Sequence, residues 1–354
     1  MGKSLTRKII EAHYVSGSMK AGEEVFIKVD QTLTHDINAV MTYLAFEAIG
    51  LDRIRTECSV SYLDHNLLYV DHKTPDDHIY LQSAAEHFGV HVSRPGNGIC
   101  HAVQVSRFGA PGKVSMGGDS HTPHGGSIGM LCIGVGGMDV ATAIMGTFAS
   151  AADILGDQID ILAEVHEKEE YEINDNLIIK PLPEEEAKKV EIVREPNIKF
   201  LPVPEVPVQH LKVPVSLKGG DNISTDDITP ASAEFSSMRS NIPLMSKYCY
   251  YRYDPEFSER AREMGSSIII GGENYGQGSS REHAAINPMY LGIKCVIAKS
   301  IARIHKGNLV NHGIVPMLFE DPADYEKVDL RDELEIENFL DQIQAREVEV
   351  KDVT

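Results

Sequence analysis

Three histidines that follow short β-like runs are the first residues in this sequence that could move a proton or hold a metal. His65 directly follows Asp64 in "SYLDH", His101 closes "RPGNGICH", and Asp119 stands two residues before His121 in "KVSMGGDSH". A carboxylate beside an imidazole orients the ring and stabilises its charged form, which suits general acid–base catalysis. The same residue types also ligate mononuclear metals. Spacing along the chain leaves both interpretations open, and each histidine alone could equally be structural.

A second candidate site is the glycine-rich stretch "GGENYGQGSSREHAA", which leads into an expected helix. Glycines let the backbone approach a ligand closely, and the amino end of a helix offers free N–H groups and a positive dipole. Ser279, Ser280 and Arg281 stand at that point, which predicts a site for a small carboxylate or phosphate. The spacing from Ser279 to Glu282 is also that of a capping box. The two interpretations are compatible.

Arg239, in "MRSNIP", is a candidate second anion clamp. A guanidinium binds a carboxylate through two parallel hydrogen bonds. Locally, an exposed arginine without such a role explains the residue equally well.

Composition limits the classes of partner. The 354 residues carry 53 acidic against 33 basic side chains, a net charge of −20. This argues against nucleic acid, whose phosphates need clustered Lys and Arg, and an anionic substrate must be attracted locally. No run approaches the ~20 apolar residues of a membrane span. No secretory signal is visible, and five scattered cysteines without a C-x-x-C are typical of a reducing compartment. We therefore expect a cytoplasmic protein.

The elements that must position these residues alternate between strands and helices. Strands are expected at 24–31 and 56–65, with helices at 34–50 and 76–90. Such alternation predicts a layered α/β domain. A proline-rich, acidic segment at 156–215 reads as a linker. Beyond it, "SSIIIGG", "SREHAAINPMYLGI" and "KCVIAKSI" form a strand–helix–strand unit.

Four stretches, "RPGNGICH", "GGDSHTPHGGSIGMLCIGVGGMD", "GGENYGQGSSREHAA" and "IAKSIARIHKGNLVNHGIVP", closely resemble the aconitase family, especially bacterial-type aconitate hydratases. The resemblance covers most of residues 1–148 and about 174–335. It implies an α/β protein with an aconitase-type N-terminal domain over 1–155, the linker over 156–215, and a C-terminal swivelling β/α domain over 216–354.

The resemblance also implies residue roles. Ser279 matches the serine whose alkoxide removes the substrate proton, and His65 would help to protonate the leaving hydroxyl. The other positions matched to catalysis are Asp64, His101, Asp119 and His121, and those matched to substrate binding are Gln31, Ser120, Arg239, Ser280 and Arg281. Family members interconvert citrate, cis-aconitate and isocitrate by dehydration and rehydration. A [4Fe–4S] cluster serves them as Lewis acid.

The sequence departs from the family where the cluster should be held. The family binds the cluster through three cysteines, one in a G-S-C-T-N-type motif and two in a C-x-x-C, and neither motif occurs here. "ATAIMGTFAS" runs directly into "AADILGD", with the family's central domains missing between. We therefore expect no metal ligand and no bound cluster in this chain alone. Asp227 and Ser232 also replace the family's usual histidine and glycine.

Three functions follow as hypotheses. The first is a hydro-lyase of the aconitase type, completed by unusual cluster ligands or by a partner chain that carries the missing domains. The alternative is an inactive, internally deleted protein that at most binds small tricarboxylates. A mononuclear-metal enzyme using His65, His101 and His121 is the third, which the resemblance disfavours. Loss of the middle would expose apolar surface, so we also expect self-association or a repacked interface.

Overall fold

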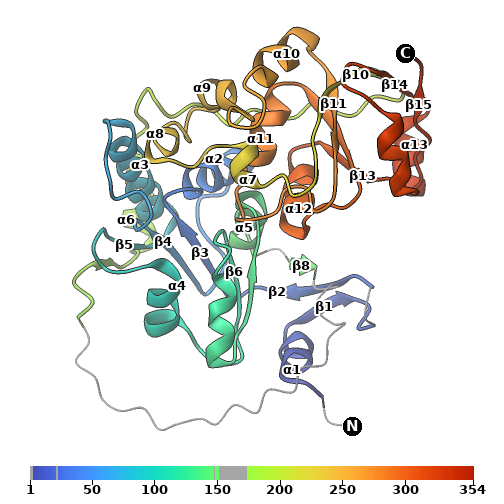
Figure 1. The fold of residues 1–354 in the computed structure, drawn as a ribbon. Helices are drawn as coiled ribbons and strands as arrows, with labels where there is room; N and C mark the ends of the chain where they lie inside the picture. Colours follow the sequence, from blue (N-terminus) through green and yellow to red (C-terminus); the bar gives the residue numbers. More distant parts are fainter. Residues whose placement is uncertain (1–2, 21–22, 147, 151–173) are drawn as a thin grey trace. The chain divides into compact units, whose positions relative to one another are not determined.

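The chain folds into two compact units, Met1–Ile198 and Lys199–Thr354. The computed structural model describes residues 3–20, 23–146, 148–150 and 174–354. Each unit is built on a six-stranded, largely parallel sheet with helices packed on it (Figure 1), which confirms the expected α/β class. Within the described ranges, no helix is long and apolar enough to cross a bilayer.

The main sheet of the first unit has the order β7-β6-β3-β4-β5-β9. Its strands are β3 (Gln31–His35), β4 (Cys58–Tyr62), β5 (His91–Ser93), β6 (Val114–Gly117), β7 (Leu131–Gly134) and β9 (Ile178–Ile179). All neighbours are parallel except β9, which is antiparallel to β5. A separate antiparallel sheet contains β1 (Tyr14–Gly17), β2 (Val25–Lys28) and β8 (Phe148–Ser150). Parallel order brings the carboxyl ends of β3, β4 and β6 to one edge.

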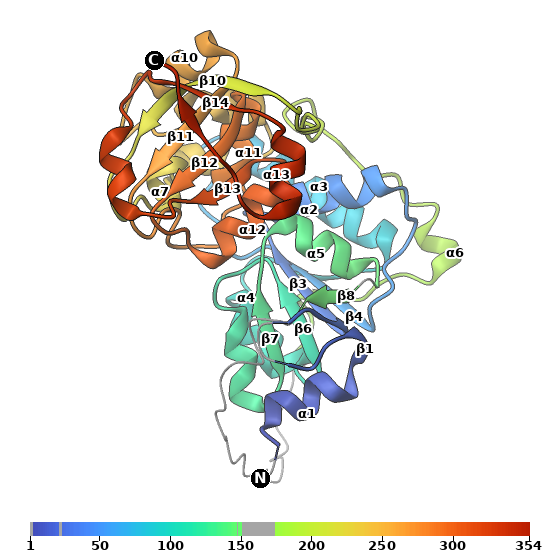
Figure 2. The ribbon, with the colours of Figure 1, turned by 90° about the vertical axis from the view of Figure 1, so that its right-hand side faces the viewer.

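Helices cover both faces of this sheet (Figure 2). Leu33 of β3 packs with Cys100 and Val103, whereas the next residue, Thr34, turns its hydroxyl towards Tyr43, 3.4 Å away. Successive strand residues face opposite sides, so β3 is covered from both. The helices of this unit are α1 (Leu5–Ala12), α2 (Ala39–Ile49), α3 (Lys73–Phe88), α4 (Cys100–Val103) with a π-helical turn at Gln104–Phe108, a 3₁₀ helix at Thr122–Ile128, α5 (Gly137–Ile144) and α6 (Glu184–Ala187).

The sheet of the second unit has the order β13-β12-β11-β10-β14-β15. Its strands are β10 (Leu211–Lys218), β11 (Ser267–Gly271), β12 (Ile293–Ala298), β13 (Val315–Leu318), β14 (Glu333–Ile336) and β15 (Lys351–Asp352). The expected strand–helix–strand unit is confirmed: β11 and β12 are parallel and α11 (His283–Tyr290) connects them. The remaining helices are α7 (Thr225–Ile228), α8 (Ala233–Ser236), α9 (Ile242–Met245), α10 (Phe257–Met264), α12 (Arg303–Asn311) and α13 (Phe339–Ala345), with 3₁₀ helices at Ser246–Tyr248 and Pro322–Lys327.

The strand expected at 24–31 is wrong as a single element. β2 ends at Lys28 in the antiparallel sheet, and β3 begins at Gln31 in the parallel one. Asp30, between them, is 2% exposed. Its carboxylate accepts hydrogen bonds from the Val114 amide at 3.0 Å and pairs with His13 Nε2 at 2.7 Å. A buried carboxylate with these partners fixes the crossing from one sheet to the other, which strand periodicity cannot reveal.

Parts of the expected linker are ordered structure. Residues 156–173 lie outside the described residues. Residues 174–198 belong to the first unit, where β9 extends the sheet, and β10 already begins at Leu211. Backbone hydrogen bonds between β9 and β5 place this segment in the first unit, although its proline content is that of a linker. The boundaries at 155 and 215 themselves stay a prediction.

Candidate functional site

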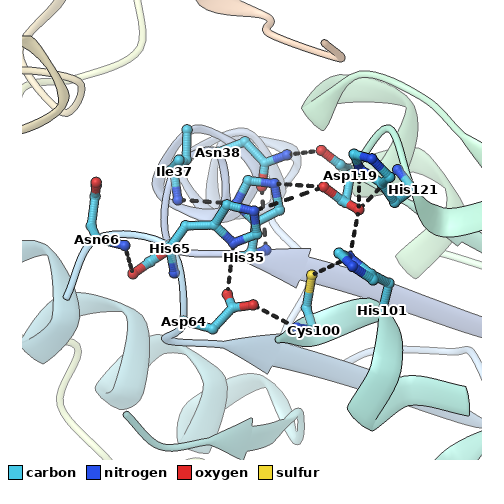
Figure 3. A network of polar contacts seen from close by, with 12 residues as sticks. His35, Ile37, Asn38, Asp64, His65, Asn66, Cys100, His101, Asp119 and His121 are labelled. Atoms are coloured by element: carbon cyan, nitrogen blue, oxygen red, sulfur yellow. Dashed lines mark hydrogen bonds and ion pairs between the residues drawn. The ribbon is translucent and has the colours of Figure 1, made fainter. Parts of the chain in front are cut away.

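Side chains from four segments of the first unit meet around the carboxylate of Asp119 (Figure 3). His35 is the last residue of β3, His65 follows β4, His101 lies in α4, and Asp119 follows β6. Only the parallel sheet order brings these segments together, because they are far apart in the sequence. The structure thus gathers the aspartates and histidines singled out from the sequence, and adds His35 to them.

Asp119 is 5% exposed and is surrounded by imidazoles. Its Oδ2 lies 3.7 Å from His35 Nε2 and 4.0 Å from His65 Nε2. Its Oδ1 lies 3.3 Å from His101 Nδ1 and 3.9 Å from His121 Nδ1. The same Oδ1 accepts the backbone N–H of His121 at 2.9 Å, which closes an Asx turn and fixes the carboxylate.

Asp64 and His65 form a hydrogen-bonded pair beside Asp119. His65 Nδ1 lies 3.0 Å from Asp64 Oδ1, and Asp64 Oδ2 accepts the Cys100 amide at 2.6 Å. Burial alone would lower the pKa of His65, but the hydrogen bond and charge of Asp64 raise it above its ordinary value. For Asp64 itself, burial works against the negative charge, yet the bond to His65 keeps the pKa of that carboxyl low. An imidazole with a raised pKa and a fixed ring orientation suits general acid–base chemistry.

His35 is the site residue that the sequence interpretation missed. It is 6% exposed, and its ring stacks on that of His65 with centroids 4.1 Å apart and planes inclined by 18°. Its Nδ1 accepts the N–H of Ile37 at 3.3 Å, so the ring proton sits on Nε2, facing Asp119. Burial lowers the pKa of His35 to about 4. The available signal was "LTHD", an aspartate–histidine neighbour pair at a strand end, as in "SYLDH".

Asp36 anchors the loop that carries His65. Its carboxylate, 3% exposed, accepts the backbone N–H groups of His65 at 3.1 Å and Asn66 at 2.9 Å. His78 Nε2 contacts the same carboxylate at 2.9 Å. The loop after β4 is therefore held by a buried charge, which makes the position of His65 a property of the fold.

Gln31 and Ser120 differ in their relation to this group. Ser120 Oγ lies 3.2 Å from His121 Nδ1, at the exposed rim. Gln31 occupies the opposite end of β3 from His35, roughly 13 Å away at the strand rise of ~3.3 Å per residue. Its amide donates to the Phe108 carbonyl at 2.9 Å and accepts from Gln104 at 3.0 Å. The structure does not bring Gln31 to the histidine group.

In the second unit, the glycine-rich loop before α11 presents Ser279, Ser280 and Arg281. Ser279 is half-buried and Ser280 is 4% exposed. The Arg281 guanidinium forms an ion pair with Asp226. This contact shows that the loop geometry lets Arg281 hold a carboxylate, here one from its own chain.

The capping box expected from Ser279 to Glu282 is wrong. The helix begins at His283 with Glu282 at the N-cap and no side-chain cap. The Glu282 carboxylate instead contacts His312 Nε2 at 2.9 Å, and both side chains are buried. A buried partner for Glu282 outweighs a capping bond at the loop.

Arg239 is 3% exposed, so its interpretation as an exposed arginine is wrong. Its backbone carbonyl lies 3.0 Å from His283 Nε2. Burial, followed by the positive charge of Arg239, lowers the pKa of His283 to about 3.

Asp227, a departure from the family pattern, accepts a hydrogen bond from the backbone N–H of Ser224 at 2.8 Å and another from the Ser224 hydroxyl at 2.6 Å. It forms a capping box that closes this turn. Ser232 is the N-cap of α8, without a side-chain capping bond.

Comparison with known proteins finds a family match within each of the two folded units. A model of the aconitase family (aconitate hydratase) matches residues 7–153, and a model of the aconitase C-terminal domain matches residues 249–322. The 3-isopropylmalate dehydratase small subunit 2 of Archaeoglobus fulgidus is 42% identical over 120 residues, which are 34% of this chain and 68% of that protein. The chain belongs to the aconitase family. The resemblance seen in the sequence is confirmed.

Other relatives in the family are much longer than the matched segments. A putative mitochondrial aconitate hydratase of Aspergillus fumigatus is 32% identical over 167 residues, 41% of this chain and 20% of that protein. The mitochondrial aconitate hydratase of Candida albicans is 46% identical over 88 residues, 24% of this chain and 11% of that protein. The matches thus span a fifth or less of these aconitate hydratases. A crystal structure of 3-isopropylmalate dehydratase from Methanocaldococcus jannaschii is 29% identical, with a TM-score of 0.30, and covers 41% of this chain and 83% of that one.

The family normally binds a [4Fe–4S] cluster, and the cysteines of this chain do not fit one. A cluster needs several thiolates around one point. Among the described residues, each group of three potential ligand side chains contains at most one cysteine, Cys100. Burial raises the pKa of Cys58 to about 11 and of Cys132 to about 12, and it raises that of Cys100 further still. These environments favour the neutral thiol, which is a poor ligand.

Proposed function

We propose that this chain supplies the substrate-handling part of an aconitase-type hydro-lyase. The observation that carries the proposal is the Arg281–Asp226 ion pair beside Ser279. It supports a loop that can accept a substrate carboxylate next to a candidate base, in a chain whose two ends both match the family. The substrate class is a small hydroxy di- or tricarboxylate. Such acids lose a proton from the carbon next to a carboxylate and a hydroxyl from the neighbouring carbon.

In this proposal, Ser279 takes the proton from carbon, while Ser280, Arg281 and Arg239 bind carboxylate oxygens. For the first unit, the proposed role of the Asp64–His65 pair is that of a general acid, because Asp64 orients the imidazole and raises its pKa. Asp119, with His101 and His121, is proposed to orient a ligand hydroxyl beside this acid in the first unit.

A second chain completes the enzyme in this proposal. General acid–base groups typically contribute ~10²–10⁴-fold, far less than an unactivated dehydration requires. The cysteines present do not fit the family's cluster, so the cluster-holding part would come from elsewhere. The A. fulgidus relative is itself a small subunit by name, which supports assembly with a larger chain. The competing candidate is an inactive protein that only binds tricarboxylates, favoured by the same lack of a cysteine set.

The test is an anaerobic assay of the full chain, alone and with any chain that co-purifies with it, after iron–sulfide reconstitution. Dehydration of citrate, isocitrate and 3-isopropylmalate is followed by the absorbance of the unsaturated product. Iron and acid-labile sulfide are counted in the same samples. Ser279→Ala is compared with Ser266→Ala, a half-buried serine of the same unit.

We expect turnover only in the reconstituted complex, lost in Ser279→Ala and kept in Ser266→Ala. Turnover by the chain alone would overturn the need for a partner. Citrate binding without turnover under any condition would favour the inactive binder, and no binding at all would refute both.

A further inference from the structure

A cavity of about 390 Å³ lies in the second unit, at the edge of the sheet where β11 and β12 begin. Its lining combines the basic residues Lys294 and Arg262 with the apolar residues Val203, Met289 and Leu291. Small-molecule sites are commonly cavities of this size, with a largely apolar lining and a few polar groups. We infer that this cavity binds a small monocarboxylate with an apolar tail. The inference goes beyond the proposed function and does not rest on it.

The cavity is separate from the glycine-rich loop of the same unit. β11, β12 and β13 are parallel, so their amino ends share one edge of the sheet and their carboxyl ends share the other. The loop that carries Ser279 follows the carboxyl end of β11 at Gly271. The cavity is lined by Gly265, Gly292 and Gly313, which come just before the three strands begin. The length of β11, roughly 13 Å at the strand rise of ~3.3 Å per residue, lies between the two edges.

Glycines leave room at this edge of the sheet. Each of the helices α10, α11 and α12 is followed by a glycine with positive φ, which is +70° at Gly265, +91° at Gly292 and +70° at Gly313. This conformation suits the end of a helix and strains other residues. A Cβ added at Gly265 would meet no atom within 4 Å, so the backbone there borders open space. Turns built from glycine therefore leave a hollow in front of the strands.

Residues 202–205 form the facing wall of the cavity. Proline at 202 and 204 fixes φ and limits how far the backbone of this wall can move. Pro204 approaches Gly313 so closely that a Cβ added to the glycine would lie 2.7 Å from Pro204 Cβ. The wall is therefore held against the turn before β13, and the cavity is a preformed feature of the unit.

Lys294 is the residue that would hold the carboxylate of the ligand. Its Nζ lies 2.6 Å from Glu205 Oε2, and this bond lowers the pKa of the Glu205 carboxyl. The Lys294 side chain is 27% exposed, whereas that of Glu205 is 82% exposed. An ion pair with so exposed a partner is weak. Glu205 thus marks a position that suits a carboxylate and that a ligand can take over.

The rest of the lining selects the chemical class of the ligand. Val203 is 85% exposed and Met289 is partly exposed, so an apolar tail beside Lys294 would remove apolar surface of both partners from water. Arg262 is an exposed second positive charge in the lining, which attracts an anion locally although the whole chain is acidic. A second carboxylate on the tail would have to leave water for an apolar wall, which is costly. The class is therefore a monocarboxylate, unlike the di- or tricarboxylates of the proposed function.

The experiment titrates the full chain with butanoate, hexanoate and octanoate. Binding is followed by the ¹³C-methyl NMR signal of Met289, which is assigned through Met289→Leu. 1-Hexanol, which lacks the charge, and adipate, which carries a second carboxylate, are compared with hexanoate. The variants are Lys294→Gln and Glu205→Gln. Lys212→Gln and Glu333→Gln are matched controls, because Lys212 Nζ and Glu333 Oε2 form a similar pair at 3.2 Å in the same unit, outside the cavity lining.

We expect saturable binding whose affinity rises about fourfold for each methylene that the cavity covers. Lys294→Gln should weaken hexanoate binding about tenfold or more, Glu205→Gln should strengthen it about two- to fivefold, and both controls should leave it unchanged. The chain-length series uses the wild type, so it keeps the test valid if a variant fails to fold. An unchanged Met289 signal, binding of 1-hexanol or adipate as tight as that of hexanoate, or equal losses in Lys294→Gln and Lys212→Gln would overturn the inference.

Discussion

Acidification should destabilise the second unit through His305, which is buried without a hydrogen-bond partner for either ring nitrogen among the described residues. The ring is 1% exposed, and burial lowers its pKa to about 4 from an ordinary 6.5. A histidine with a depressed pKa in the folded state takes up protons preferentially when the chain unfolds. This histidine therefore lowers the free energy of unfolding by little above pH 6.5 and by increasing amounts as the pH falls towards 4.

The magnitude follows from the two pKa values. At pH 5 the unfolded imidazole is almost fully protonated and the folded one only about a tenth. With 1.36 kcal/mol per pKa unit, the difference is about 2 kcal/mol. At pH 7.5 it is close to zero. The pKa values of His283 and His35 are also lowered, so these residues destabilise the folded state at low pH as well. The contribution of His305 is therefore obtained by comparing the wild type with a variant that lacks His305.

The assay is urea unfolding at pH 7.5 and pH 5.0, read by hydrogen exchange in peptides that cover α12. His305→Leu removes the titrating group without leaving an unpaired polar atom. The variant should lose about 2 kcal/mol less than the wild type between the two pH values. His210→Leu, at an exposed position, should lose as much as the wild type. Equal losses in His305→Leu and the wild type would refute the buried, neutral state of His305.

Two further predictions concern the second unit, around its glycine-rich loop before α11. Gly276 has φ +77°, and an added Cβ would lie 2.0 Å from Cδ2 of His305, so Gly276→Ala should cost about 2 kcal/mol or more and lower Tm. Gly307→Ala, in open space within α12, should instead stabilise by ~0.5–1 kcal/mol; a similar response of the two variants would contradict this account. Asp226→Asn frees Arg281 from its internal carboxylate. Since exposed pairs are worth ~0.2–1 kcal/mol, calorimetry should show citrate binding up to about fivefold tighter, and weaker binding would count against Arg281 as the carboxylate site.

Local features of the fold were readable from local sequence. The helix expected to end on Gly50 does so, with that glycine at φ +79° as the C-cap of α2, because only glycine takes this conformation without cost. The runs rich in isoleucine and valine became the buried strands β11 and β12. Both follow from properties of single residues and their immediate neighbours.

Features that depend on long-range pairing were misread or missed. The split between β2 and β3 depends on Asp30 meeting His13 and the Val114 amide. The failed capping box depends on Glu282 finding His312. In each case a buried carboxylate is satisfied by a residue distant in sequence, and the energy of that contact outweighs the local preference.

The sequence by itself determined the family, the types of residue at the strand ends, and the absence of cysteine motifs for a cluster. Only the tertiary structure decided which strand ends are neighbours. β3 lies between β6 and β4, so His35 and His65 meet at Asp119, while Gln31 is carried to the other end of its strand. Sheet order is set by packing on both faces of the sheet, and that packing is a property of the whole unit, which no single stretch of sequence contains.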